Sequence, residues 1–295
     1  MAFIRTSSSL RNCSHLVHNK HNKYHRHYQR RYSQLTSSSR MMATSTSLNS
    51  NNSNNGDIDV RILCLHGKGG NGEQFINKSL QPLRSMIDKR CKDNNNISFQ
   101  WEAITAPYQI SPPTNKEADD GGYAWWTMPP GVRSYNAKEY IGFDVSEDMV
   151  MDELHKSDII LGHSQGAMLI AALLSKHDKL WNTAIDDSPM GYILNGVAWP
   201  NPFSSSLKAL STQEINNSLL PRMLFVMGKE DNINPIESAM QVHDVYKEGN
   251  FDVSIVNHNS GHSVPVRRDD DSIRALEEIC DWIIDIAKRK AELST

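Results

Sequence analysis

The stretch that most constrains the fold is a short glycine–serine motif between two apolar segments. Residues 162–166 read Gly-His-Ser-Gln-Gly, directly after an apolar strand pattern and before an apolar helix pattern. Gly-x-Ser-x-Gly in this context is typical of a nucleophile elbow, a sharp turn that holds a serine clear of a sheet. The positions two before and two after the serine must be small, because the helix backbone passes close there, and Gly162 and Gly166 meet this demand. The alternative is a glycine-rich turn in which Ser164 caps a helix, so an acid, a base and an oxyanion hole are needed to decide.

Strand and helix patterns alternate along most of the chain. Strands are expected at residues 60–65, 97–104, 158–161, 190–197, 223–227 and 251–256, and helices at residues 74–90, 146–154, 165–176, 235–246 and 272–290. Pro82 predicts a kink or break in the first helix, Ser146 is expected to cap the second, and residues 107–136 look irregular. Continuous apolar strands between helices are typical of a mostly parallel sheet covered on both faces. The sequence therefore predicts a doubly wound α/β fold.

The first 56 residues differ in composition from the rest. They contain eight Lys or Arg and no Asp or Glu, and residues 48–56 form an Asn/Ser-rich linker. An acid-free start rich in Arg and Ser resembles an organellar transit peptide, the alternative being a disordered basic tail. We therefore expect a targeting tail at 1–56 and one folded domain at 57–295, located in the mitochondrion or another organelle, or else in the cytoplasm. A start at Met41 or Met42 would bypass most of the tail and give two forms in two compartments.

Charge and cysteine content exclude several classes of partner. Residues 57–295 carry 23 basic and 34 acidic side chains, a net charge of −11, which argues against nucleic acid as a ligand of the folded part. No run of 18 apolar residues occurs, so no membrane span is predicted. The scattered cysteines, Cys13, Cys64, Cys91 and Cys280, show neither metal-ligand spacing nor a disulfide framework, so we expect reduced thiols and no metal. Nothing in the pattern assigns an oligomeric state.

Two residues after later strands are candidates for the partners of the serine. A serine hydroxyl needs a base to accept its proton, and the base needs an orienting acid. Asp231 follows the strand at 223–227, and His262 follows the strand at 251–256, so both are expected at the same sheet edge as Ser164. Glu230 competes with Asp231 as the acid, and His258 competes with His262 as the base.

The backbone amides of an oxyanion hole have equally local candidates. One donor is expected from Gln165, the residue after the serine. The other is expected from Lys68, in the glycine-rich loop that follows the strand at 60–65. His66 is expected to brace this loop, and His163 is expected to pack away from the reactive face of the serine.

Several motifs together resemble a known family. They are Leu-His-Gly at residues 65–67, Gly-His-Ser-Gln-Gly-Ala at 162–167, Gly-x-x-Asp at 228–231, Gly-His-Ser-Val-Pro at 261–265 and Tyr-Ala-Trp-Trp at 123–126. Over residues 60–288 the chain resembles the FSH family of serine hydrolases, although the elbow alone is also similar to acyl-protein thioesterases. The resemblance implies a single-domain α/β-hydrolase fold, hydrolysis of small-molecule carboxylic esters or thioesters, often with acyl chains, and no cofactor. It also implies that Ser164 is the nucleophile, Asp231 the acid and His262 the base.

The segment that carries the two tryptophans has two interpretations. Residues 107–136 are expected to border the substrate pocket, where Trp125 and Trp126 would offer apolar surface to an acyl chain. The alternative is that both side chains pack the core.

Two other functions remain open from the sequence. Gly67, Gly69 and Gly72 satisfy Gly-x-Gly-x-x-Gly before a helix, the fingerprint of a Rossmann-type nicotinamide-dependent enzyme. That function needs an acid about 20 residues further on, and the candidates are Asp88, Asp93 and Glu102, none of them well placed at the end of the second strand. The third possibility is a hydrolase fold with a dead triad that only binds ligands.

Overall fold

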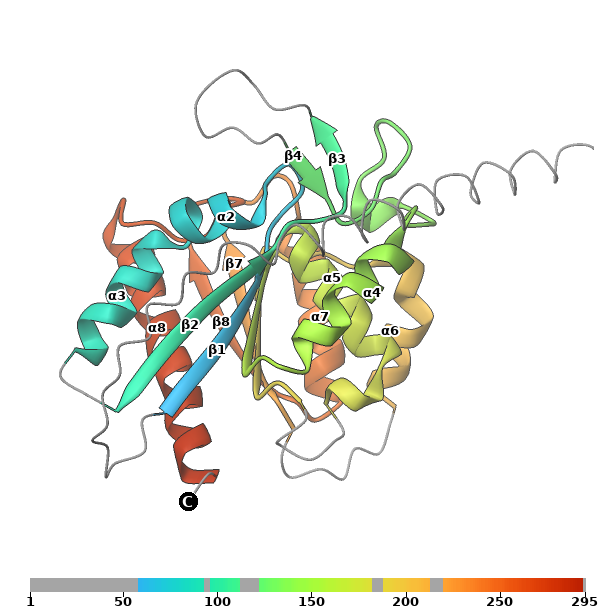
Figure 1. Cartoon of the computed structure of the whole chain (residues 1–295). Coiled ribbons are helices and arrows are strands. Elements are labelled where there is room, and N and C mark those ends of the chain that lie inside the picture. The colour runs from blue at the N-terminus through green and yellow to red at the C-terminus, as the bar shows by residue number, and fades with distance from the viewer. Residues whose placement is uncertain (1–57, 93–95, 112–121, 182–187, 213–219, 294–295) are drawn as a thin grey trace, which may run out of the picture. The chain divides into compact units, whose positions relative to one another are not determined.

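The computed structural model describes residues 58–92, 96–111, 122–181, 188–212 and 220–293 (Figure 1). All of them belong to one compact unit, Ser53–Thr295. The expected targeting tail at 1–56, with the alternative starts at Met41 and Met42, lies outside the described residues. No helix among the described ranges is both long enough and apolar enough to cross a membrane.

Six strands form one parallel sheet. They are β1 (Ile58–Leu65), β2 (Ile97–Ile104), β5 (Ile159–His163), β6 (Gly191–Asn195), β7 (Arg222–Gly228) and β8 (Asp252–His258). Their order across the sheet is β2-β1-β5-β6-β7-β8, and every neighbouring pair is parallel. Each predicted strand is found, with its ends shifted by no more than two residues, and the predicted parallel sheet is confirmed.

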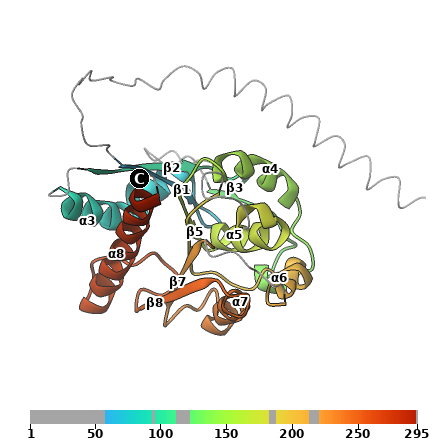
Figure 2. The same ribbon diagram turned by 90° about the horizontal axis from the view of Figure 1, so that it is seen from below.

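Helices cover both faces of this sheet (Figure 2). On one face lie α3 (Gln81–Cys91) and α8 (Asp270–Leu293); on the other lie α4 (Phe143–Leu154), α5 (Gln165–Lys176), α6 (Ser204–Leu210) and α7 (Ile236–Glu248). Alternate residues of each strand point to opposite faces, so Ile62 joins the core under α3 and α8, whereas Leu63 joins the core around α5. The doubly wound architecture is therefore confirmed.

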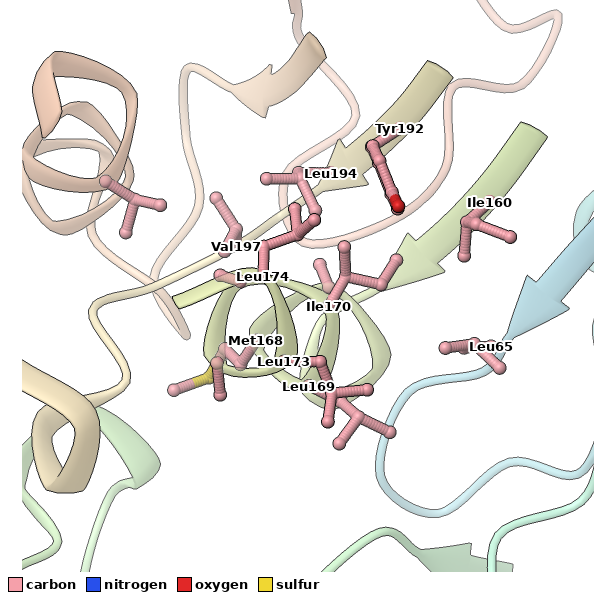
Figure 3. Packing of buried hydrophobic residues seen from close by; sticks show 14 of the residues in the cluster. Leu65, Ile160, Met168, Leu169, Ile170, Leu173, Leu174, Tyr192, Leu194 and Val197 are labelled. Atoms are coloured by element: carbon pink, nitrogen blue, oxygen red, sulfur yellow. The ribbon is translucent and has the colours of Figure 1, made fainter. Parts of the chain in front are cut away.

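The helix after the serine motif is buried over most of its length. Residues 165–174 of α5 are all buried, and Figure 3 shows their apolar side chains against those of β5 and β6. The labelled side chains are Met168, Leu169, Ile170, Leu173 and Leu174 from the helix, with Leu65, Ile160, Tyr192, Leu194 and Val197 around them. Burial of one such side chain stabilises the fold by about 1.5–3 kcal/mol. The start of α5 is thus fixed in position by the core behind it.

The predicted helix at 74–90 is broken, as Pro82 led us to expect. A three-residue helix, α2 (Gly72–Gln74), is followed by a π-helical turn, η1 (Phe75–Ser79), and α3 starts afresh at Gln81 with the proline in its first turn. A proline is tolerated there because the first amides of a helix have no intrahelical partner.

Two predictions for the part of the chain between β2 and β5 were wrong. Residues 107–136 include a two-stranded antiparallel sheet, β3 (Tyr108–Ser111) and β4 (Gly122–Ala124), so they are not irregular throughout. Ser146 does not cap α4, which begins at Phe143. Its hydroxyl is fully buried and instead donates a hydrogen bond to the carbonyl of Trp125. A serine near the start of a helix can cap the helix or can donate to a buried carbonyl group of another segment. The sequence pattern is the same in both cases.

Candidate active site

The site lies where the connections of the sheet change direction. The chain leaves β1 for β2 on one side and returns to β5 on the other side of β1. In open α/β sheets such a point leaves a crevice at the carboxyl ends of the two central strands. The glycine-rich loop follows β1 there, and Ser164 follows β5.

Ser164 occupies a strained turn. Its backbone angles are φ 53° and ψ −113°. A residue other than glycine that is held in such a sparsely populated region destabilises the fold by on the order of 1–3 kcal/mol. The turn also brings the strand and the helix close together. A Cβ atom on Gly166 would lie 2.2 Å from the carbonyl oxygen of Leu65, and one on Gly162 would lie 2.6 Å from the amide nitrogen of Ala167. Both glycines are therefore required by close packing, as the motif predicts.

A continuous chain of hydrogen bonds runs from this serine to a buried carboxylate. The Ser164 hydroxyl lies 2.7 Å from Nε2 of His262, and Nδ1 of His262 lies 2.6 Å from Oδ2 of Asp231. The three residues come from loops after β5, β8 and β7, which end at the same edge because β7 and β8 pair in parallel up to Gly228 and His258. We call these three side chains the Ser–His–Asp array.

Backbone amides fix the carboxylate of the array. Oδ1 of Asp231 accepts from the amides of Ile233 and Asn234, both at 2.8 Å, and the side chain is 3% exposed. Burial alone would raise the pKa of Asp231, but the hydrogen bonds from His262 and these amides outweigh it and hold the pKa below its ordinary value. Asn234 also donates its side-chain amide to the carbonyl of Gly196 at 2.7 Å, which ties the acid loop to the end of β6. Sequence reasoning missed this role of Asn234.

The two competing residues lie elsewhere. Glu230 is exposed, whereas the imidazole of the array bonds to Asp231. His258 is 1% exposed, and its Nδ1 accepts a hydrogen bond from the amide of Ser260 at 3.1 Å. Burial lowers the pKa of His258 and keeps it neutral. The geometry thus brings Asp231 and His262 to the serine and leaves both rivals outside the array.

The loop after β1 presents its backbone to the serine. A Cβ atom on Gly67 would lie 3.1 Å from Cβ of Ser164, so the loop backbone passes directly beside that side chain. The amide of Gly69 donates to the carbonyl of Tyr123 at 2.7 Å, and that of Gly70 donates to Gly67 at 3.1 Å. Across the described ranges the amide of Lys68 has no such partner. Gln165 is the first residue of α5, where an amide has no intrahelical acceptor.

His66 braces the loop, as expected. The amide of Ala106 donates to its Nε2 at 2.9 Å, so the proton of the neutral ring must sit on Nδ1, which donates to the carbonyl of Gly67 at 2.7 Å. Burial lowers the pKa of His66 to about 4, so the ring stays neutral near pH 7. One tautomer satisfies both bonds and holds β1, the loop and the end of β2 together.

The side chain of Gln165 has a role that the sequence did not reveal. It is 2% exposed; its Oε1 accepts from the amide of Trp125 at 3.0 Å, and its Nε2 donates to the carbonyl of Trp126 at 3.3 Å. It therefore fastens the tryptophan segment to the start of α5. The sequence feature that could have indicated this role is the position of Gln165 between Ser164 and Gly166. A polar side chain at the start of a helix that the fold buries needs hydrogen-bond partners.

His163 packs against neighbouring side chains, but the expectation that it points away from the reactive face of the serine is corrected, because it lines the same pocket as Ser164. Its ring stacks on Phe75 with centroids 6.0 Å apart, and its Nδ1 accepts from the side-chain amide of Asn195 at 2.7 Å. Burial and the neighbouring His262 lower the pKa of His163 to about 3. The two imidazole centroids lie 5.2 Å apart. A neutral ring therefore flanks the array on one side.

A pocket of about 810 Å³ opens over the array. Its walls come from the loop after β1, η1, residues 128–134, the serine turn and the acid and base loops. Trp125 and Trp126 do not line it: both are fully buried in the core, and Trp126 stacks on Tyr140 with centroids 4.1 Å apart. The expectation that they contact the substrate is corrected, because the clamp by Gln165 turns this segment inward.

The residues considered for a metal, a disulfide or a dinucleotide lie outside the array. The described residues contain no group of three or more His, Cys, Asp or Glu side chains suited to a metal ion. Cys64, Cys91 and Cys280 are free thiols, and Cys13 lies outside the described residues. Of the acids considered for a dinucleotide site, Glu102 pairs with Arg61 at 3.0 Å, Asp88 lies in α3, and Asp93 is not among the described residues.

Comparisons with known proteins show the family of the chain. The family model described as serine hydrolase (FSH1) matches residues 57–272. Esterase OVCA2 of Danio rerio is 30% identical over 141 residues, which cover 41% of this chain and 58% of that protein. Hydrolase phiM of Fungal sp. (strain ATCC 74256) is 24% identical over 212 residues, covering 70% of this chain and 86% of that protein. The match thus spans somewhat over half the length of the first relative and most of the second.

Solved structures support the fold. Esterase PE8 superposes with a TM-score of 0.52 at 17% identity, over 78% of this chain and 94% of the other. The F65L variant of SOBER1 from Arabidopsis thaliana gives a TM-score of 0.52 at 17% identity, over 77% and 99%. At this identity the likeness shows the fold alone, and the fold is that of the α/β-hydrolases.

Proposed function

Because the chain belongs to the FSH1 family of serine hydrolases, we propose that it cleaves small-molecule carboxylic esters, with Ser164 as nucleophile, His262 as base and Asp231 as orienting acid. The observation that carries this proposal is the unbroken hydrogen-bonded path from the Ser164 hydroxyl to the buried carboxylate. The names of its relatives, an esterase and a hydrolase, agree with it.

Each member of the array has a defined task in this mechanism. The ionised Asp231 accepts a hydrogen bond from Nδ1–H of His262, which leaves the Nε2 lone pair free to take the proton of Ser164. The serine oxygen then attacks the ester carbonyl carbon. His262 returns the proton to the leaving alcohol, and a water molecule repeats the two steps on the acyl-enzyme. The strained turn at Ser164 keeps its hydroxyl exposed to the substrate throughout.

The amides of Lys68 and Gln165 are the proposed oxyanion donors. They flank the serine from the loop after β1 and from the start of α5. Loss of one such donor typically costs about 100–1,000-fold in kcat. The bonds from Gly69 to Tyr123 and from His66 to Gly67 hold the Lys68 amide in place before substrate arrives.

The pocket sets the size of the substrate. Its volume of about 810 Å³ lies within the range of roughly 300–1,000 Å³ that is usual for small-molecule sites. Apolar side chains on its walls, among them Phe75, Met128 and Met168, suit an acyl chain. The proposal covers oxygen esters and thioesters alike.

The test is covalent labelling combined with turnover. A fluorophosphonate probe is expected to label the protein on Ser164, and Ser164→Ala is expected to abolish labelling and to lower hydrolysis of 4-nitrophenyl esters by several orders of magnitude. Ser205→Ala, in an exposed position on α6, is the matched control and should behave like the wild type. Labelling at another residue, or full activity of Ser164→Ala, would refute the proposal. A binding protein with a dead triad would show neither labelling nor turnover.

We also propose that residues 1–56 direct the protein to an organelle, on the grounds of their acid-free, Arg- and Ser-rich composition. Fusion of these residues to a fluorescent protein should give mitochondrial or other organellar fluorescence, whereas a fusion that starts at Met41 should stay in the cytoplasm. Identical distributions of the two fusions would exclude a targeting role.

A further inference from the structure

The charges on the pocket walls are all of one sign. Among the described residues that line it, three carry a positive charge, Lys68, Lys78 and Arg133, and none carries a carboxylate. Lys68 and Lys78 stand on the wall formed by the loop after β1 and by η1, and Arg133 stands on the wall formed by residues 128–134. Cations therefore face the pocket from two separate segments.

These cations are not used elsewhere in the described chain. No ion pair or side-chain hydrogen bond joins any of the three to another described residue. Asp231, the acid of the array, stands behind His262 with both carboxylate oxygens already hydrogen-bonded. The concentration of positive charge runs against the net charge of −11 over residues 57–295, so it is not a consequence of general composition.

A buried hydrogen-bond donor lies on the same wall. Asn71 is 2% exposed, its Oδ1 accepts from the amide of Gln74 at 2.8 Å, and its Nδ2 has no partner among the described residues. A buried donor without a partner is costly, on the order of 1–3 kcal/mol, unless a ligand satisfies it. Asn71 is also among the residues that line the pocket, so this unpartnered amide belongs to the same wall as Lys68 and Lys78.

Apolar side chains also line the pocket. They include Met128, Val132, which is 36% exposed, and Ile233, which is 44% exposed. A ligand that matches both kinds of lining has an apolar portion and a negatively charged group. A purely aliphatic ester would leave the cations without a counter-charge.

We propose that the substrate is an ester that carries an anionic group, a carboxylate or phosphate, on its acyl or its alcohol part, and that Lys78 and Arg133 bind this group. The inference rests on the proposed function, because it names the substrate class of the same site. The charged group does not take part in the bond changes at Ser164. It adds binding energy remote from the ester, which positions the carbonyl carbon in front of the serine.

The experiment compares matched charged and neutral esters. On the acyl side, the mono-4-nitrophenyl ester of hexanedioic acid is compared with its methyl ester; on the alcohol side, 4-carboxyphenyl hexanoate is compared with its methyl ester. We expect kcat/KM to favour the anionic ester of at least one pair by about 10-fold at 0.01 M ionic strength. The preference should shrink at 1 M, where the Debye length falls from about 30 Å to about 3 Å.

Substitution identifies the cations that are responsible. The double variant Lys78→Met/Arg133→Met should reduce the preference to within about 3-fold, whereas Lys247→Met, which removes an exposed charge from the distant α7, should leave it intact. The products provide a readout without turnover: Ser164→Ala should bind the hexanedioate dianion more tightly than the monoanion of its monomethyl ester, or 4-hydroxybenzoate more tightly than its methyl ester.

The outcomes separate the two proposals. If Ser164-dependent hydrolysis occurs but neither pair shows a preference for the anion, the anionic substrate class is wrong and the esterase function stands. If no ester is cleaved while the product with the additional anionic group binds preferentially, the charge-binding site stands and the proposed hydrolysis fails. A preference that survives in the double variant would also overturn the assignment to Lys78 and Arg133.

Discussion

Replacement of Gln165 by Met tests how the serine turn is joined to the tryptophan segment. Methionine has nearly the same length and volume as glutamine, so the change removes two hydrogen bonds while it creates little cavity. The backbone amide of residue 165, the proposed oxyanion donor, is kept. What is lost is the acceptor for the amide of Trp125 and the donor for the carbonyl of Trp126.

The size of the effect follows from burial. Gln165 is 2% exposed and both tryptophans are fully buried, so water cannot replace the lost partners without a rearrangement. Each buried polar group left without a partner costs about 1–3 kcal/mol, which gives about 2–6 kcal/mol for the two backbone groups. For a domain of this size, 1 kcal/mol shifts Tm by roughly 2–4 °C, so Tm should fall by at least about 4 °C.

Denaturant unfolding followed by tryptophan fluorescence, together with calorimetry, measures this loss. Gln81→Met is the matched control: the side chain of Gln81 donates to the hydroxyl of Ser85 in an exposed position on α3, so its loss should cost less than about 0.5 kcal/mol. If Gln165→Met unfolds within about 0.5 kcal/mol of the wild type, the side chain does not clamp the segment, and the explanation given for the buried tryptophans is wrong.

Three further predictions concern the array and its supports. Asp231→Asn should lower kcat by about 10,000-fold with the fold intact, whereas Glu230→Gln should retain activity; the reverse result in an ester hydrolysis assay would make Glu230 the acid. Burial lowers the pKa of His66 from 6.5 to about 4, so the unfolded state takes up a proton first as pH falls, and this histidine alone should lower the free energy of unfolding by about 1.4 kcal/mol per pH unit between these values. His163, whose pKa is lowered to about 3, adds its own slope over the same range, so urea unfolding at stepped pH is compared between the wild type and His66→Asn; equal slopes would show that His66 makes no contribution. Gly166→Ala should destabilise the protein by about 1–3 kcal/mol or more, because its Cβ would meet the carbonyl oxygen of Leu65 at 2.2 Å; an unchanged unfolding midpoint would contradict the close packing described for the turn.

The elements that the sequence predicted best are those whose pattern is local and strong. The apolar run and glycine spacing around Ser164 are contained within a few residues, and they predicted a strand, a tight turn and a buried helix, all of which are found. Asp231 and His262 were placed at one sheet edge because parallel strands present their carboxyl ends together. That rule needs only the strand order along the chain.

The choice between rivals needed three-dimensional information. Glu230 and Asp231 are adjacent in sequence, and which carboxylate turns toward the imidazole depends on the amides of Ile233 and Asn234 that hold it. His258 lies four residues before His262, but β8 extends two residues beyond the predicted end and takes His258 into the sheet. The apolar pattern fixes the end of a strand only to within about two residues. Here a shift of that size decides that His258 lies in the sheet and that His262 is the histidine that reaches the serine.

The position of the tryptophans could not be read from their own segment. Two adjacent aromatic residues near an expected pocket are compatible with contact to a ligand or with burial, since the same apolar surface serves both. Ser146 accounts for part of the outcome by donating to Trp125 from α4, and Gln165 accounts for the rest from α5. Each of these partners is more than 20 residues away from Trp125. A local sequence pattern therefore could not predict that the tryptophans are buried.

The resemblance of the first loop to a dinucleotide fingerprint has a packing explanation that needs no nucleotide. Gly67 lies where a Cβ would meet the ring of His163 at 2.9 Å, so it must be small for the loop to pass the serine turn. Gly69 has φ +87°, a left-handed conformation that favours glycine. A Cβ on Gly72 would lie 3.1 Å from Ala103, where α2 passes over β2.

A loop that makes a tight turn between a strand and the start of a helix needs small residues and left-handed backbone angles. These requirements are the same whether the loop binds a pyrophosphate or an oxyanion. The spacing of glycines therefore reports the turn and the packing, and only the residues that the loop faces, here Ser164 and His262, distinguish the chemistry.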